Sequence, residues 1–318
     1  MVAVTRHLRR PLYGFALAVS ALTAGVVCVI GVLGFALAWE GFVVLRELVK
    51  GNMSREEPRF SNTGDADVMF FWAGAPVALL LLLLLAVVLA LLDTAHAAAV
   101  RHALGGHGRL GAAGLWRRAR PYFLRGLGAQ VPTLLCVAVT ALVGVMLFDS
   151  LADGGLIPGI ERPQSPFTGF SALDWVAGLG LPLLAACVGP YLYARFSLAG
   201  SAAVFEDAPV GAALRRSWRL TRGGAQGRVV GAWLVITAAV ALVFALLRYA
   251  ALPIGDALGP AMMWLSGGNV YTTATLVHVT PFAVAFALLP VAVLVPSGLA
   301  LPLLYVHLHA RERERPTA

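Results

Sequence analysis

Charged residues are scarce in this sequence. Asp, Glu, Lys and Arg make up 13% of the 318 residues, whereas the apolar set A, V, I, L, M, F, W, Y and C makes up 59%. A typical soluble domain has about 25% charged residues and about 45–50% apolar residues, with glycine included. A soluble globule of this length has too little interior to hide so much apolar surface. The composition therefore excludes a soluble domain, a disordered chain and a disulfide scaffold, and it predicts a polytopic membrane protein.

Cysteine and lysine are the scarcest of the chemically active residues. The three cysteines (Cys28, Cys136 and Cys187) lie within apolar runs, and none has a second cysteine at Cys-x-x-Cys spacing. We interpret them as small buried apolar side chains. Lys50 is the only lysine, so arginine carries almost all of the net charge of +8. In so apolar a chain, this charge indicates contact with anionic lipid headgroups rather than with nucleic acid.

Known catalytic patterns are also missing. There is no Gly-x-Ser-x-Gly elbow, no His-Glu-x-x-His motif and no phosphate-binding loop. No ionisable residue lies near the centre of an apolar run, where it would mark a transport path. We therefore expect a chain without catalytic residue, cofactor or metal site. A membrane-embedded enzyme is the weakest alternative, and it would have to use the acidic residues Glu40, Asp149, Asp153 and Asp174.

Long apolar runs determine the predicted fold. A membrane-spanning helix needs about 20 apolar residues, and long apolar runs in lipid form helices because the backbone must pair internally. The runs lie at 12–38, 68–92, 127–148, 175–196, 229–247 and 281–305. They predict an all-α integral membrane bundle of six transmembrane helices, forming one domain over 1–318. Residues 250–269 are apolar but broken by proline and glycine, which indicates an interfacial or re-entrant hairpin, with a seventh span as the alternative.

The distribution of basic residues predicts the orientation of the bundle. Three lie in the N-terminal tail, six in each of the second and fourth connections, and three in the C-terminal tail, against six in the remaining connections. Because cytoplasmic connections carry the excess of Lys and Arg, both termini are predicted to be cytoplasmic. The first run is longer than the 7–15 apolar residues of a signal peptide, so we interpret it as a retained anchor.

The fourth connection contains the clearest local pattern. At 100° per residue, a helix over Pro209–Arg222 places Val210, Leu214 and Trp218 on one side and four arginines on the other. Tryptophan opposite arginine is typical of a helix that lies in the membrane interface. Such a helix binds lipid headgroups or a partner, or it merely docks under the bundle and sets the topology. The candidate binding residues here are Arg215, Arg216, Trp218, Arg219 and Arg222.

The second connection repeats part of this pattern. Trp116-Arg117-x-x-Arg120 matches Trp218-Arg219-x-x-Arg222, and each motif precedes an apolar run by a similar distance. We therefore predict a second cytoplasmic amphipathic helix and an internal duplication of 68–148 and 175–247. Parallel repeats of this kind occur in membrane proteins, although two Arg-rich connections also converge by chance. The candidate binding residues here are Trp116, Arg117, Arg118 and Arg120.

The sequence "ALRRSWRLTRG" at Ala213–Gly223 resembles a family of uncharacterised bacterial integral membrane proteins. That family is similar to the membrane domain of glycerophosphoryl diester phosphodiesterase. The resemblance covers about 40 residues, from Ala194 to Val235, and it implies a bacterial plasma-membrane protein. It does not imply phosphodiesterase activity. The catalytic barrel of such enzymes needs at least about 200 residues, and no connection here is long enough to hold one.

Two functional hypotheses follow from these patterns. The first is a non-enzymatic membrane component that binds anionic lipid or a membrane-protein partner through the Arg-rich helices. The alternative is a transporter or flippase of an apolar or lipid-like substrate, because proline breaks helices that line substrate sites. The sequence does not determine the substrate, the partner or the oligomeric state. The relevant prolines are Pro182 and Pro190 in the fourth run and Pro290, Pro296 and Pro302 in the sixth.

Overall fold

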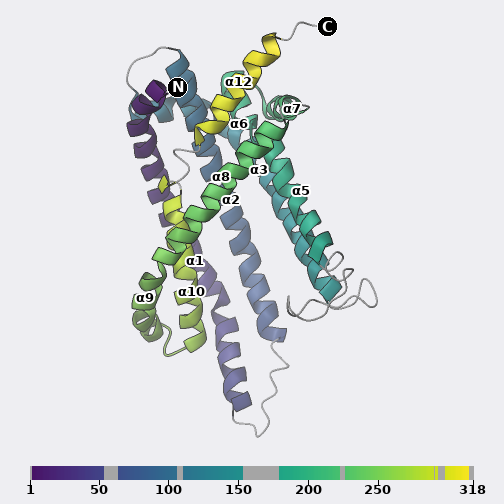
Figure 1. The fold of residues 1–318 in the computed structure, drawn as a ribbon. Coiled ribbons are helices and arrows are strands. Elements are labelled where there is room, and N and C mark those ends of the chain that lie inside the picture. The colour runs from purple at the N-terminus through teal and green to yellow at the C-terminus, as the bar shows by residue number, and fades with distance from the viewer. Residues whose placement is uncertain are drawn as a thin grey trace. The chain divides into compact units, whose positions relative to one another are not determined.

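The computed structural model describes residues 2–53, 64–105, 110–152, 179–222, 226–289, 291–292 and 298–314 (Figure 1). Within these ranges the chain is helical apart from short turns and contains no strand. The prediction of an all-α protein is therefore confirmed for the part of the chain that the structure describes. Asp153, Asp174, Pro290 and Pro296 lie outside it.

Long helices dominate the structure. They are α1 (Val2–Met53), α2 (Gly64–Leu104), α3 (Ala112–Ala152), α5 (Leu181–Phe196), α8 (Gln226–Ala250) and α10 (Val270–Leu289). The shorter helices are α6 (Ala199–Phe205), α7 (Val210–Leu220), α9 (Leu252–Leu265) and α12 (Ala300–Glu314). Within the described ranges, six stretches are long and apolar enough to cross a membrane, as predicted. They are Pro11–Glu47, Met69–Leu104, Ala112–Ser150, Leu181–Phe205, Gln226–Ala250 and Val270–Leu289.

The sixth of these stretches begins earlier than predicted. The sequence placed it at 281–305, whereas α10 begins at Val270 and ends at Leu289. The side chain of Asn269 explains the early start, because its Oδ1 accepts hydrogen bonds from the backbone amides of Tyr271 and Thr272, at 3.1 and 3.3 Å. Such bonds satisfy amides that lack a partner in the first turn of a helix. Asn269 also donates to the carbonyl of Phe42 in α1, which ties the start of α10 to that helix.

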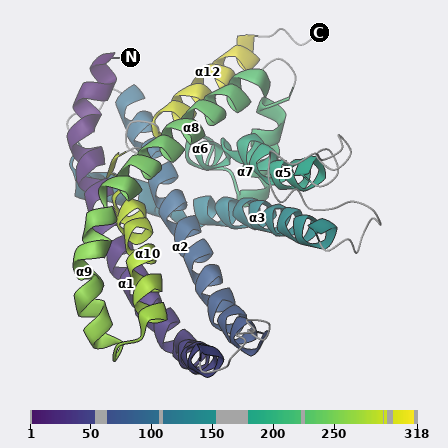
Figure 2. The same cartoon turned by 60° about the horizontal axis from the view of Figure 1, so that its bottom comes forward.

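Residues 250–269 contain a regular helix where the sequence predicted a broken hairpin. The helix α9 has 14 residues, which is fewer than the about 20 that a membrane-spanning helix needs. It ends in a turn at Gly267 and Gly268, whose φ angles of 60° and 80° suit glycine. Helix α10 then returns beside α9 (Figure 2).

Gly255 lets α9 approach α10 closely. A Cβ atom on Gly255 would lie 2.7 Å from the carbonyl oxygen of Val277. That oxygen lacks its usual helical donor because Pro281, four residues later, has no N–H. Gly255 therefore faces the turn of α10 in which one backbone hydrogen bond is missing.

Two spanning helices continue into the polar segments that border them. Helix α2 extends past the predicted end at residue 92 to Leu104, and α3 begins at Ala112 rather than at residue 127. Both extensions are rich in alanine, leucine and arginine, which have the highest helix propensities. Trp116–Arg120 therefore lies in the same helix as the third span, and the separate helix predicted for the second connection is replaced by a continuation of α3.

The contacts divide the chain into two compact units. Unit 1 comprises residues 1–88, 108–116 and 236–298, and unit 2 comprises residues 89–107, 117–235 and 299–318. Unit 2 has an apolar core in which α6 is buried along its length and contacts α7 and α12. Many core residues are alanines, and small residues let helix backbones approach closely in membrane proteins. This core positions the Arg-rich segments of unit 2.

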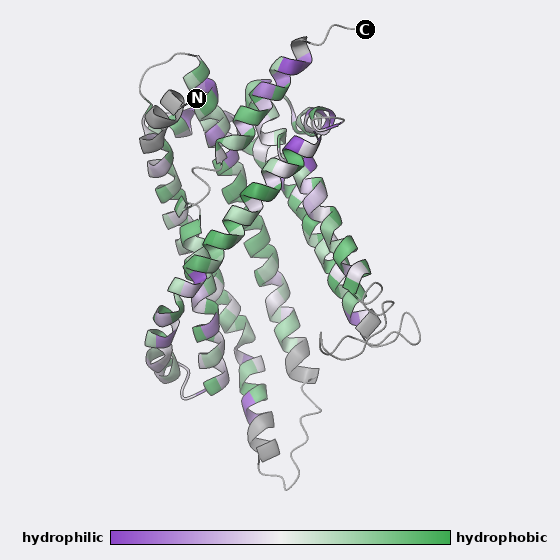
Figure 3. Cartoon of the chain, in the orientation of Figure 1, coloured by the Kyte–Doolittle hydropathy of each residue, from purple (hydrophilic) through white to green (hydrophobic). Residues whose placement is uncertain are grey.

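The long helices consist mostly of apolar residues (Figure 3), and many of their large apolar side chains are exposed. Contiguous exposed apolar surface of this kind marks contact with a membrane. The three cysteines, Cys28, Cys136 and Cys187, belong to this surface, because they are free and exposed. The prediction that they are buried is wrong. Helices in lipid turn apolar residues outward as well as inward, so an apolar neighbourhood in the sequence does not indicate burial within the protein.

Candidate binding site around the Arg-rich helix α7

The segment predicted to form a helix at Pro209–Arg222 contains α7, whose N-cap is Pro209 in an extended conformation. Its buried side chains are Ala213, Ser217 and Leu220. Ala213 and Leu220 belong to the apolar core of unit 2 together with Ala199, Ala202 and Ala203 of α6, and this core holds α7 in place.

Arg195, in the last turn of α5, anchors the end of α7. Its side chain is buried, and its Nη1 donates a hydrogen bond of 3.1 Å to the carbonyl of Thr221. The guanidinium carbon lies 4.2 Å from the ring centroid of Trp218, which is a cation–π contact. In return, the hydroxyl of Ser217 donates to the carbonyl of Arg195 at 2.7 Å. The end of α7 is therefore attached to α5 by a reciprocal set of contacts.

Asp207 shapes the connection that leads into α7. Its φ of 53° is in the left-handed region, which aspartate tolerates better than most residues. Arg101 of α2 donates to the carbonyl of Val204 at 2.6 Å, and Arg125 of α3 donates to the carbonyl of Asp207 at 3.0 Å. Both arginines also lie within 4 Å of the Asp207 carboxylate, at 3.8 and 3.6 Å. Two arginines from the spanning helices thus hold this connection in place.

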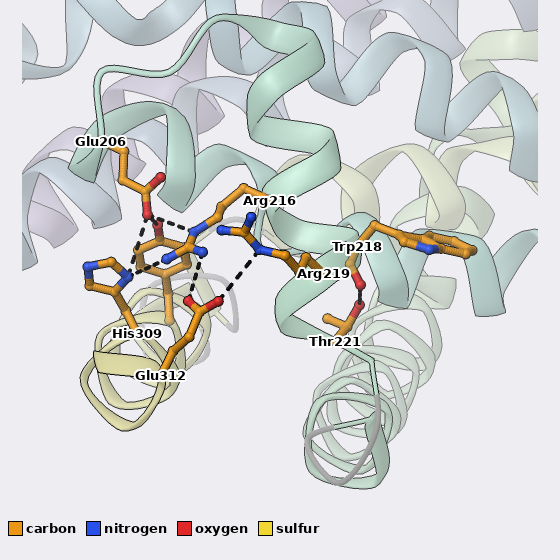
Figure 4. Close-up of polar contacts among 8 residues, drawn as sticks. Glu206, Arg216, Trp218, Arg219, Thr221, His309 and Glu312 are labelled. Carbon is orange, nitrogen blue, oxygen red and sulfur yellow. Dashed lines mark hydrogen bonds and ion pairs between the residues drawn. The ribbon is translucent and has the colours of Figure 1, made fainter. Parts of the chain in front are cut away.

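Arg216 lies at the centre of a polar network between α7 and α12 (Figure 4). Its Nε donates to Glu206 at 2.9 Å, its Nη1 pairs with Glu312 at 2.7 Å, and its Nη2 donates to Nδ1 of His309 at 2.6 Å. Tyr305 donates from its hydroxyl to the same carboxylate of Glu206. Only 11% of the Arg216 side chain is exposed. Arg216 is therefore a structural cation inside the network.

The network stabilises the charged form of Glu206. Partial burial raises the pKa of Glu206, but hydrogen bonds from Tyr305 and Arg216 and the charge of Arg216 outweigh burial and hold it below 4.5. Burial also raises the pKa of Tyr305, and its bond to the Glu206 carboxylate raises it further. Tyr305 therefore remains a hydrogen-bond donor to an ionised Glu206 at neutral pH.

A cavity of about 560 Å³ lies next to this network. Its polar lining consists of Glu206, Arg216, Arg219, Tyr305 and His309, and its apolar lining consists of Leu104, Phe205 and Val306. The cavity therefore combines charged and apolar walls, as a site for an amphiphilic ligand requires.

The predicted binding residues separate into two groups. Arg216 and Arg219 turn toward α12, where Arg219 contacts Glu312 at 3.5 Å. Trp218 is held between Phe196 and Arg195, and Trp116 stacks on Phe15 in unit 1. The other predicted arginines are exposed, and none has an ion pair with another described residue. They are Arg117, Arg118, Arg120, Arg215 and Arg222.

Sequence reasoning missed the acidic and aromatic partners of α7. Tyr305, His309 and Glu312 are spaced four and three residues apart, so they share one face of α12. That spacing is a usable signal in the sequence. Glu206 carries no such signal, since its contact with Arg216 depends on how α6 and α7 pack.

Acidification is expected to loosen the contact between α7 and α12. Because the folded state lowers the pKa of Glu206, its stabilising contribution is full above pH 4.5 and is lost as the pH falls through the lowered value. A hydrogen bond to a charged group contributes about 1.5–3 kcal/mol to the free energy of unfolding. Because Glu206 is partly exposed, we expect its hydrogen bonds to contribute at the lower end of this range. We expect the protection factor of the α7 amides, which is the intrinsic exchange rate divided by the observed rate at the same pH, to decrease as the pH falls below 4.5 in the parent protein.

Glu206→Gln is expected to show lower protection factors in α7 already at pH 7 and a weaker dependence of these protection factors on pH. Asp256→Asn is the matched control, because Asp256 is exposed and has no ion pair with another described residue. An unchanged pH dependence in Glu206→Gln would contradict this assignment.

The comparisons with known proteins found no relative. No family model, no curated protein and no solved structure matches this chain. The resemblance of Ala213–Gly223 to the membrane domain of glycerophosphoryl diester phosphodiesterase therefore stays a prediction. The candidate site rests on its own geometry in a polytopic membrane protein with six candidate spans.

Proposed function

We propose that this chain is a non-enzymatic component of a bacterial plasma membrane that binds anionic lipid headgroups on its cytoplasmic side. The observation that carries the proposal is the set of exposed arginines without an intramolecular carboxylate among the described residues. We refer to these five residues as the outward arginines; they are Arg117, Arg118, Arg120, Arg215 and Arg222.

Four of the outward arginines lie on α3 and α7, and Arg222 follows the last residue of α7, Leu220. A Cβ atom on Gly128 of α3 would lie 2.8 Å from a methyl carbon of Val210 in α7, so the two helices are in close contact there. Arg215 is exposed on α7, and Arg222 is exposed two residues after that helix ends. Each basic residue near an anionic membrane surface contributes about 1 kcal/mol to the attraction. Several such residues on one rigid unit therefore favour anionic lipid over zwitterionic lipid.

The test replaces all five outward arginines with glutamine in the full chain. The protein is reconstituted in nanodiscs of equal parts phosphatidylglycerol and phosphatidylcholine, and the lipid retained after extraction is measured by native mass spectrometry. We expect the parent protein to retain phosphatidylglycerol selectively, in a salt-sensitive manner, and the glutamine variant to lose that selectivity.

Replacement of the same five residues with lysine is the matched control. Lysine keeps the charge, so selectivity for phosphatidylglycerol is expected to persist. Equal retention of phosphatidylglycerol by the parent protein and the glutamine variant would refute the proposal. A stoichiometric protein that is lost together with the five arginines would indicate that the surface binds a protein partner instead.

A further inference from the structure

Two arginines of α7 hold one carboxylate from the end of α12. Arg216 Nη1 and Arg219 Nε lie 2.7 and 3.5 Å from the two oxygens of Glu312. The two arginines are three residues apart, so they project from adjacent positions on one helix face. Glu312 is partly exposed, and it contacts the arginines from the last turns of the helix (Figure 4). A carboxylate held in this way occupies a place that a phosphate oxygen also fits.

The lining of the adjacent cavity has an excess of positive charge. Arg216 and Arg219 line it together with a single carboxylate, Glu206, while His309 is the remaining titratable basic group. Glu206 is already engaged by Tyr305 and by Nε of Arg216. Arg219 is 66% exposed and has no partner other than Glu312 among the described residues. The cavity therefore favours an anion over a cation once the Glu312 carboxylate moves away from the two arginines.

Aromatic rings and aliphatic side chains form the rest of the cavity lining. Phe205, Tyr305 and His309 form a stack, with ring centroids 5.6 and 6.0 Å apart. Leu104 and Val306 complete the apolar lining, and Leu104 is largely exposed. Free phosphate has no apolar part that could contact these side chains. The glycerol backbone and the first part of an acyl chain of a phospholipid do contact them.

We propose that this cavity binds one anionic phospholipid. Its phosphate is held by Arg216 and Arg219 in place of the Glu312 carboxylate, and its apolar part lies against Leu104, Phe205 and Val306. Glu312 acts as an internal competitor that the lipid displaces. This inference rests on the proposed function and deepens it from a charged surface to a single site with defined contacts.

The test titrates the detergent-purified full chain with dioctanoyl phosphatidylglycerol and follows bound lipid by native mass spectrometry. Glu312→Gln removes the competitor, and we expect it to tighten binding by about threefold to tenfold. Arg219→Gln removes one of the two arginines that hold the phosphate. We expect it to weaken binding about tenfold, which corresponds to the loss of one charged hydrogen bond. Arg216 is left intact because it also supports the fold.

Arg228→Gln is the matched control, and Arg215→Gln is measured beside it to show the effect of an outward arginine. Arg228 is exposed and belongs neither to the cavity lining nor to the outward arginines, so its replacement is expected to change the affinity by less than about twofold. The melting temperature of each variant is measured in parallel, and the exposed position of Arg219 makes misfolding of that variant unexpected. Dioctanoyl phosphatidylcholine and inorganic phosphate serve as ligand controls, and both are expected to bind far more weakly than the anionic lipid.

Three results would overturn the inference. One is an affinity that Glu312→Gln leaves unchanged. Another is an equal loss in Arg219→Gln and Arg215→Gln, which would show that only the outward arginines act and would leave the proposed function standing. The last is inorganic phosphate that binds as tightly as the lipid, which would assign the site to a soluble phosphate. Loss of selectivity in the five-arginine variant with an intact response to Glu312→Gln would support the cavity independently of the surface.

Discussion

Replacing Gly189 with alanine is expected to separate α3 from α5 and to destabilise unit 2. A Cβ atom on Gly189 would lie 2.1 Å from Oγ1 of Thr140 and 2.7 Å from the Cα atom of Val137. The Thr140 hydroxyl can rotate, but the backbone of α3 can move only as a whole helix. Overpacking of this kind costs about 1–3 kcal/mol, occasionally more. This cost exceeds the gain in helix propensity of about 1 kcal/mol that alanine brings over glycine.

The interface between α3 and α5 contains a second close approach. A small shift of α3 therefore cannot relieve the clash at residue 189 without affecting this second contact. A Cβ atom on Gly144 of α3 would lie 2.9 Å from the carbonyl oxygen of Pro182 in α5. We expect a lower temperature of aggregation for Gly189→Ala, measured by gel filtration of heated samples in detergent. Gly231→Ala is the matched control, because a Cβ atom there meets nothing within 4 Å. A Gly189→Ala protein as stable as Gly231→Ala would show that α3 and α5 do not pack in this way.

Replacing Arg195 with methionine is expected to release the end of α7. Methionine fills a similar volume with an apolar chain, but it leaves the buried carbonyl of Thr221 without its 3.1 Å donor. An unsatisfied buried group costs about 1–3 kcal/mol, and loss of the stack on Trp218 removes a desolvated cation–π contact of about 2 kcal/mol. The substitution also removes a buried charge, which offsets part of this destabilisation. The effect is therefore expected mainly in the local stability of α7.

Hydrogen exchange of the backbone amides of α7 is the appropriate measurement. Each 1.4 kcal/mol of lost local stability accelerates exchange about tenfold, and we expect at least that acceleration for Arg195→Met. Arg195→Lys keeps the charge but not the planar stack, so an intermediate rate is expected. Arg215→Gln serves as the neutral control. If exchange in α7 were the same in Arg195→Met and in Arg215→Gln, the anchoring role of Arg195 would have to be abandoned.

The apolar runs were sufficient to predict six helices long enough to cross a membrane, because run length and hydropathy are local properties of the chain. They were insufficient for helix boundaries. Helix α10 begins at Val270 because Asn269 caps it, and α3 begins at Ala112, well before the apolar run. A hydropathy pattern indicates which residues can contact lipid, whereas a helix ends where its backbone hydrogen bonds end.

The Arg-rich segment around α7 was also visible in the sequence, since its residues lie close together in the chain. What each arginine contacts was not visible. Arg216 pairs with Glu312 of α12, and Arg195 stacks on Trp218, whereas Arg215 remains exposed. Arginines that are close together in the sequence thus differ in environment, since some contact other helices and others face outward. The periodicity of one helix assigns faces, but only neighbouring helices decide which face meets protein.

The sequence by itself therefore determined the class of protein, the number of candidate spans and the position of the basic segments. These follow from composition and from periodicity, which each residue contributes locally. The tertiary structure decided the contact of Asp93 with Gln130 between α2 and α3, the network around Arg216 and the cavity that it borders. Such features join residues that are tens of positions apart, and they form only when the packing of small residues brings the helices together.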